Sequence, residues 1–309
     1  MTASSCEFLH GLFIFRLGMK TSPSARDIEA AQRVSLWLDG HDAITTAAEA
    51  KKFLKSVSIA LRYGATEGLP LASIYAAVHV PRESAAKNRE TQKEREQDRE
   101  LLRRAIELTN GLMAYREGIE INVIADRLVL AHRDLLPAIY FLRRRGRRLD
   151  DTANLSAEAK RALALLKQKL IATAGEVRSH LRLERGERHD PVVEALSELQ
   201  REMLLDRGPS DVPKTGIPYL SRDGYPYRIF HEVHRDLVAK AGKLTVKAAA
   251  DLVIGRYLKG AVYASPRKLA SMFKLFLSAE EIDESVERLS AKKAVKLDRV
   301  GRTEVVVSR

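Results

Sequence analysis

The second half of this 309-residue chain repeats one order of elements twice, and this repeat limits the possible fold more than any other feature. Each copy is predicted to form a helix, a short helix, a third helix and then a β-hairpin. In the first copy, Ser156, Thr173 and Asp190 stand where N-caps of three successive helices are expected. Asp190 is followed by Pro191, a residue favoured in the first turn of a helix.

The second copy is more compact and predicts the same order. Its helices are expected at residues 246–258, 266–276 and 279–289, and its hairpin strands at 294–297 and 303–307. This order is typical of a winged helix-turn-helix domain, whose third helix often enters the major groove of DNA. We therefore predict a mainly α fold with small β-hairpins, built from tandem winged helix-turn-helix domains.

Four segments are predicted along the chain. Residues 1–20 are interpreted as a poorly ordered or misannotated extension, with Met19 as an alternative start. Residues 21–150 are expected to form an N-terminal α/β domain, for which a degenerate winged helix is one interpretation. Residues 151–240 and 241–309 are predicted to be the two winged-helix domains.

The charge balance favours a polyanionic partner. The chain has 53 Lys and Arg against 41 Asp and Glu, a formal net charge of +12. Its single cysteine, Cys6, fits a reducing compartment, and no apolar run is long enough to span a bilayer. We therefore predict a cytoplasmic protein with double-stranded DNA as its partner and no membrane contact.

No metal or cofactor site is predicted. His231 and His234 miss the zincin spacing because position 235 is Arg, so both are assigned to the surface or to helix caps. Residues 208–215 resemble a phosphate-binding loop, but Pro213 lacks the N–H group that would contact a phosphate.

The distribution of charge argues against the usual docking mode. Both predicted third helices carry rows of carboxylates, which phosphates would repel: Glu194, Glu198 and Glu202 in the first, and Glu280, Glu281, Asp283, Glu284 and Glu287 in the second. Basic residues lie elsewhere, at helix ends, on the second helices and on the last hairpin. The run 143–148 contains no acid, and it either complements a helix dipole or contacts phosphates. The candidate DNA-binding residues are Arg143, Arg144, Arg145, Arg147, Arg148, Arg178, Arg182, Arg185, Arg267, Lys268, Lys274, Arg299 and Arg302.

From about residue 127 onward the chain resembles the AlkZ-related winged-helix family, relatives of crosslink-repair DNA glycosylases. The resemblance rests on four short segments and an aromatic strand near Tyr227: residues 127–130, 134–140, 155–161 and 195–200. It implies tandem winged-helix domains around a concave surface that faces DNA. It also implies a further, degenerate winged helix in the N-terminal part.

One departure from the family limits what the resemblance implies. Its glycosylases carry a Gln-x-Gln or Gln-x-Asp motif that positions the attacking water, and residues 43–80 contain none; the corresponding run is 57–61. We therefore predict a DNA-binding protein that grips duplex phosphates through basic helix ends and wings, without base excision. The alternatives are an active glycosylase for alkylated or crosslinked bases, a transcription regulator, and a scaffold that binds a protein through its acidic helices.

Overall fold

The computed structural model describes residues 24–62, 64, 69–79, 92–186, 189–210, 222–300 and 302–309. The prediction for residues 1–20 lies outside this part of the chain. The described residues are mainly helical with short strands, so the predicted fold class is confirmed at this level. No helix among them is both long enough and apolar enough to cross a membrane.

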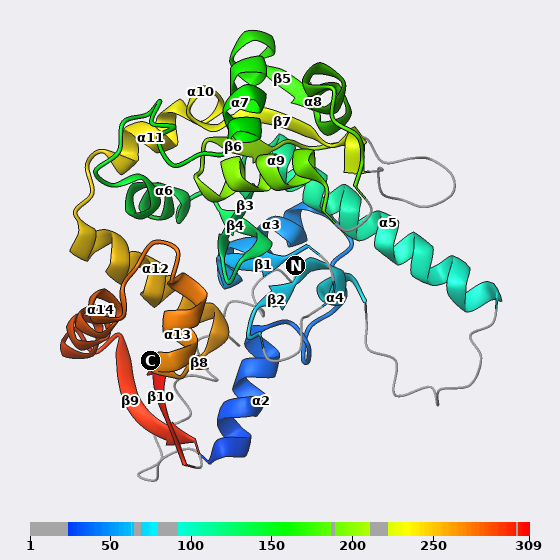
Figure 1. Cartoon of the computed structure of the whole chain (residues 1–309). Coiled ribbons are helices and arrows are strands. Elements are labelled where there is room, and N and C mark those ends of the chain that lie inside the picture. Colours follow the sequence, from blue (N-terminus) through cyan, green and yellow to red (C-terminus); the bar gives the residue numbers. More distant parts are fainter. Residues whose placement is uncertain are drawn as a thin grey trace.

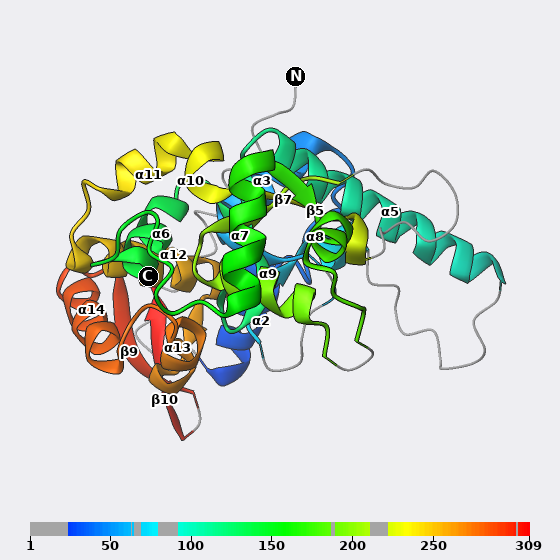
Figure 2. The same ribbon diagram turned by 45° about the horizontal axis from the view of Figure 1, so that its top comes forward.

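The N-terminal elements end with a helix that follows the first hairpin. They are α2 (Ala25–Ser35), α3 (Ala47–Val57), β1 (Ile59–Leu61), β2 (Ala72–Ser73), α4 (Ile74–Val78), α5 (Gln92–Ala114), β3 (Gly118–Ile124), β4 (Arg127–His132) and α6 (Leu136–Arg144). The first half of α5 projects from the body of the protein (Figures 1 and 2).

The middle elements are α7 (Ala157–Lys169), β5 (Ile171–Thr173), α8 (Ala174–Leu181), α9 (Pro191–Arg201), β6 (Leu205–Arg207), the 3-10 helix η1 (Arg222–Gly224), β7 (Pro226–Ile229), α10 (Phe230–Val233) and α11 (Arg235–Ala241). The C-terminal elements are α12 (Val246–Ala261), β8 (Tyr263–Ala264), α13 (Pro266–Phe273), α14 (Ala279–Ala291), β9 (Val295–Val300) and β10 (Thr303–Ser308).

Three segments of the described chain share one order of elements: first helix, first strand, second helix, third helix and hairpin. We name them unit 1 (47–132), unit 2 (157–229) and unit 3 (246–308). In each unit the first strand pairs antiparallel with the last strand, which pairs with the middle one. The resulting strand orders are β1-β4-β3, β5-β7-β6 and β8-β10-β9.

The same local signals recur at equivalent places in the three units. A Ser or Thr side chain caps each first and each second helix: Thr46, Ser156 and Thr245, then Ser73, Thr173 and Ser265. Non-glycine residues with φ between 52° and 66° stand just before each first strand and two residues before each middle strand: Ser58, Leu170 and Val262, then Arg116, Met203 and Lys293. Because positive φ is uncommon outside glycine, this recurrence indicates one shared backbone geometry.

Units 1 and 2 form one continuous sheet through their middle strands. β3 pairs antiparallel with β6, with Glu120 opposite Arg207, and the sheet has the order β2-β1-β4-β3-β6-β7-β5. On each side of the β3–β6 junction, the strands of the unit follow in the same order: the middle strand, then the last, then the first. The two units are therefore arranged about an approximate twofold axis at this pair.

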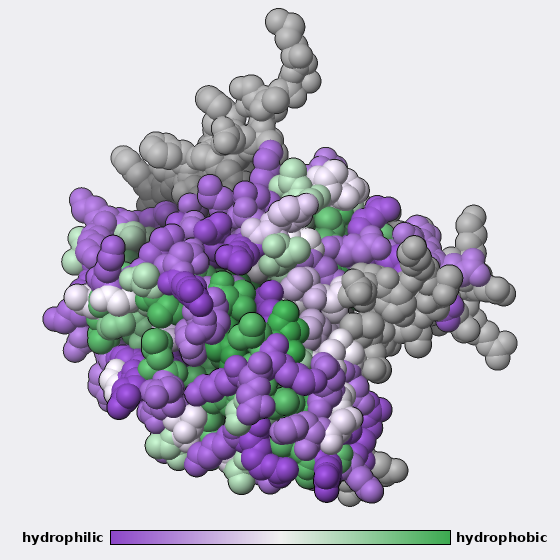
Figure 3. Space-filling model, turned by 90° about the horizontal axis from the view of Figure 1, so that it is seen from above, coloured by the Kyte–Doolittle hydropathy of each residue, from purple (hydrophilic) through white to green (hydrophobic). Residues whose placement is uncertain are grey.

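The unit 1 strands are buried on both faces, so alternate residues enter different cores. On β4, Val129 and Ala131 pack in the cluster that contains α6 and α12. Leu130, between them, packs with Phe53 and Leu54 of α3. Unit 3 lies below the other two in Figure 1, in orange and red, with α12 against α6 and α3. Seen from above, the surface is mainly hydrophilic around a smaller hydrophobic area (Figure 3).

Candidate nucleic-acid interface

The basic run at the end of α6 has internal partners, beginning with Arg143. Its Nε donates to the backbone oxygen of Arg201 over 2.6 Å, and its Nη1 donates to that of Leu275 over 3.1 Å. Its Nη2 donates to Oε1 of Glu202 over 2.5 Å. Arg143 therefore links the C-terminal ends of α9 and α13, and only 13% of its side chain is exposed.

The next arginines of the run also face carboxylates of the third helices. Arg147 pairs with Glu202, and Nη1 of the buried Arg144 lies 4.0 Å from the same carboxylate. Arg145 donates to Glu281 at the start of α14. Arg144 is buried and Arg143 is largely enclosed, and both have internal partners, so neither offers an open guanidinium group to a duplex. In this run Arg148 is the most open, with 87% of its side chain exposed and Asp150 at 3.4 Å.

These contacts also explain the acidic row on α9. Glu202, just past its last residue, balances the arginines of α6. Glu198 accepts hydrogen bonds from the backbone N–H and the hydroxyl of Ser156, at the start of α7. Glu194 lies 3.2 Å from Nδ1 of His189. Most of the row therefore joins parts of this chain, whereas Glu280, Asp283 and Glu287 of α14 face solvent.

The end of α8 holds three of the predicted basic residues in different environments. Arg178 is largely buried and donates to Asp190, the N-cap of α9, and to Asp223 of η1. Burial alone would raise the pKa of Asp190, but the hydrogen bonds from Arg178 and the α9 backbone outweigh it and lower that pKa. Arg185 is half exposed and pairs with Asp223 at 2.6 Å. Arg182 is exposed, caps α8 at φ 53°, and forms no ion pair with a described residue.

The basic residues predicted in unit 3 are mostly open to solvent. Arg267, in the first turn of α13, is exposed, and Lys268 beside it is half-buried. Lys274 lies 3.4 Å from Asp126 in the β3–β4 turn. Arg299 and Arg302 are exposed near the tip of the β9–β10 hairpin. Figures 1 and 2 place this tip far from α8, so the two groups of cations are not brought together.

Two buried charge clusters are not predicted from the sequence. At the β3–β6 junction, the fully buried Glu120 lies between Arg207 and Arg62, and the Arg207 guanidinium stacks 4.2 Å from the Tyr225 ring centre. Burial would raise the pKa of Glu120, but the two arginines outweigh it and lower that pKa. In the sequence, Glu120 is an acidic residue beside a run of β-branched residues, and nothing there indicates which arginines it pairs with.

The second cluster surrounds His234, which stands at the cap position between α10 and α11, one of the two places predicted for it, but is buried and not on the surface. His234 is buried, and its Nε2 lies 2.9 Å from Oδ2 of Asp206, which also accepts from Arg228 over 2.6 Å. The ring packs against Phe230, with 4.8 Å between ring centres. This cluster attaches the segment that follows β7 to strand β6. None of its residues lines a described pocket.

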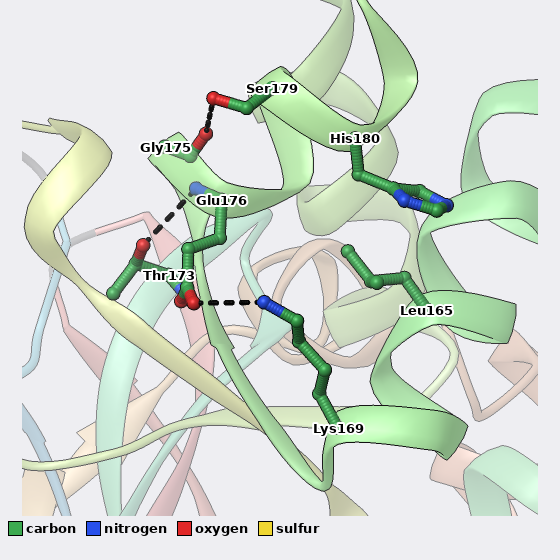
Figure 4. Close-up of a pocket in the computed structure, with 7 residues that line it drawn as sticks. All are labelled: Leu165, Lys169, Thr173, Gly175, Glu176, Ser179 and His180. Atoms are coloured by element: carbon green, nitrogen blue, oxygen red, sulfur yellow. Dashed lines mark hydrogen bonds and ion pairs between the residues drawn. The ribbon is translucent and has the colours of Figure 1, made fainter.

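No cluster typical of metal binding is found in the described ranges. They hold no group of three His, Cys, Asp or Glu side chains able to bind a metal ion. A shallow hollow of about 570 Å³ lies between α7 and α8 (Figure 4). Its carboxylate, Glu176, is engaged by Lys169 at 3.1 Å and by the backbone N–H of Thr173 at 2.7 Å. The hollow therefore offers no unengaged carboxylate beside its imidazole, which belongs to His180.

Comparison with known proteins gives one structural likeness. No family model matches the sequence, and no curated protein matches it. The structure is similar to that of the Streptomyces sahachiroi DNA glycosylase AlkZ, with a TM-score of 0.53 and 14% identity, over 93% of this chain and 70% of that one. The resemblance predicted from the sequence is thus confirmed in fold, and this chain shares the fold of a DNA glycosylase.

Proposed function

We propose that this protein binds double-stranded DNA and that each of its three units is a winged-helix domain, the first of them degenerate. The observation that carries the proposal is the shared fold with a DNA glycosylase, which extends over nearly the whole chain. The net charge of +12 agrees with a polyanionic partner. A role connected with DNA repair follows from the same likeness.

The proposed contacts are those of the predicted DNA-binding residues that are exposed and form no ion pair with a described carboxylate. They are Arg182 at the end of α8, Arg267 on α13, and Arg299 and Arg302 on the β9–β10 hairpin. Arg148, Arg185 and Lys274 are exposed beside these regions and each has one acidic neighbour. The exposed acids of α14 would repel phosphates, so second helices and wings are favoured over third helices.

We propose further that the protein does not excise bases. The strand that corresponds to the glycosylase motif is β1, whose residues Ile59, Ala60 and Leu61 are apolar and buried. No amide or carboxylate on this strand can orient water for attack on a glycosidic bond.

Binding of a short fluorescent duplex, measured across a salt series, tests the DNA-binding proposal. Four arginine–phosphate contacts predict a slope of log affinity against log salt of about −3.6. Absence of binding at low salt would overturn the proposal and leave the acidic face of α14 as the candidate surface for a protein partner. Abasic-site formation on alkylated or crosslinked duplex would contradict the non-excising part alone and favour an active glycosylase.

A further inference from the structure

The first helices of units 1 and 3 meet at their C-terminal ends. Gly260 in the last turn of α12 lies against the backbone of Val57, the last residue of α3. A Cβ atom at position 260 would stand 2.5 Å from the Val57 carbonyl oxygen, which only glycine avoids. The two helix ends are therefore held in a fixed relation.

These two helices carry six basic residues, of which Lys247 lies at the far end of α12. Lys52 and Lys55 are exposed on α3, Lys259 is exposed on α12, and Arg256 is half-buried one turn before it. None of the four forms an ion pair with a described carboxylate. Lys51, by contrast, pairs with Glu117. We name Lys52, Lys55, Arg256 and Lys259 the α3–α12 basic face.

A buried histidine, His132, lies beside the end of α3. His132 ends β4, and its backbone N–H donates to the carbonyl of Ser58 over 2.8 Å. Its pKa is lowered by burial, and the charges of both Arg256 and Lys55 lower it further, against Asp134 and Glu117. Lys55 lies two residues before Val57 and Lys259 directly before Gly260, so the contact between Val57 and Gly260 brings these two lysines to one junction.

Compensation of the helix dipoles does not account for this charge. Each helix C-terminus carries about half a negative charge, so the two ends offset about one of the four cations. Asp134, which lies 3.5 Å from Nδ1 of His132, offsets roughly one more. Glu117 is already paired with Lys51. About two positive charges remain on a surface fixed by backbone packing.

We propose that the α3–α12 basic face is a second contact surface for the phosphate backbone of double-stranded DNA. This inference rests on the proposed function and extends it to the side of the protein where units 1 and 3 meet. Three of the four groups are lysines, which bind phosphates as point charges. The contact is therefore independent of sequence and positions the duplex.

Charge reversal tests this surface in the full-length chain. The variants are Lys52→Glu with Lys55→Glu, and separately Arg256→Gln with Lys259→Glu. Loss of two phosphate contacts is expected to make the salt slope shallower by about 2 and to weaken binding at low salt. The matched control is Lys160→Glu with Lys167→Glu, two exposed lysines of α7 that form no ion pair with a described residue. The control is expected to bind as the unmodified protein does.

Amine acetylation with and without duplex gives a second measurement that needs no substitution. Lys52, Lys55 and Lys259 are expected to be protected by DNA, and Lys160 is not. If the unmodified protein binds DNA while the α3 and α12 variants keep its affinity and slope and the three lysines stay reactive, this inference is overturned and the proposed function stands. If the unmodified protein does not bind DNA, the proposed function itself fails.

Discussion

Arg143 and Glu202 form a hydrogen-bonded ion pair of 2.5 Å that joins the end of α6 to the end of α9. The first residue belongs to the most basic run of the chain, and the second to the acidic row of a third helix. Each run suggested a surface in the sequence, one for phosphates and one for a protein. In the structure they largely neutralise each other, so DNA contacts must be sought on cations outside this pair.

Replacing Glu202 with Ala is expected to destabilise the protein by about 2–3 kcal/mol, because it leaves Arg143 and Arg147 without their carboxylate in a largely buried place. Urea unfolding measures the effect. Glu194→Ala on the same helix is the control: its partner is the exposed His189, so the loss should stay below about 0.5 kcal/mol. Equal losses in the two variants would contradict the structural role of the Arg143 pair.

Gly260→Ala is expected to destabilise the contact of α12 with α3 by about 1–3 kcal/mol, because the new methyl group overlaps the Val57 carbonyl. Gly255→Ala, one turn earlier on α12, is the matched control. A Cβ there meets Leu289 at an ordinary 3.6 Å, so the gain in helix propensity should leave stability unchanged or raised. Thermal unfolding of both variants measures the difference, and a neutral Gly260→Ala would show that the helices are not in close contact.

His132 makes stability depend on pH below neutrality. Its Nδ1 accepts from the Asp134 backbone N–H at 3.3 Å, and burial lowers its pKa below the ordinary 6.5. The unfolded chain therefore binds the proton more readily, and stability is expected to fall as the pH drops below about 6.5. His132→Asn removes the titrating group and should flatten this part of the urea-unfolding profile. Identical pH profiles for the two proteins would rule out His132 as the source.

The exposed arginines carry the prediction for DNA. Arg182→Glu with Arg185→Glu should make the salt slope of duplex binding shallower by about 1, through loss of the Arg182 contact, and Arg299→Glu with Arg302→Glu should make it shallower by about 2. Lys240→Glu with Lys243→Glu serves as the control, since both lysines are exposed and form no ion pair with a described residue. Unchanged affinity in both arginine variants, with thermal unfolding unaltered, would remove these residues from the interface.

Local signals allowed much of the fold to be predicted. Ser156, Thr173 and Asp190 cap α7, α8 and α9 as expected, because an N-cap depends on a side chain and the backbone two or three residues later. Strand limits were less accurate. The first strand of the last hairpin was expected at residues 294–297, but β9 runs over Val295–Val300.

The candidate site could not be predicted from the sequence where it depends on pairs of residues that are far apart in the chain. Arg143 and Glu202 are separated by 59 positions, so the sequence showed two charged runs and not their neutralisation. The burial of His234 was not predicted because its partner Asp206 lies 28 positions away, on β6. The α3–α12 basic face escaped notice for the same reason, since its two halves come from the first and third units.

The pairing of Glu120 with Arg207 makes units 1 and 2 depend on each other. Loss of Glu120 would leave Arg62 and Arg207 buried without their carboxylate, at a cost of several kcal/mol. An exchange of one unit alone must therefore keep the matching charge at this place. Separation of the two units near residue 150 would expose both middle strands as open edges prone to aggregation. Although the three units share one order of elements, the first two depend on each other for a closed sheet.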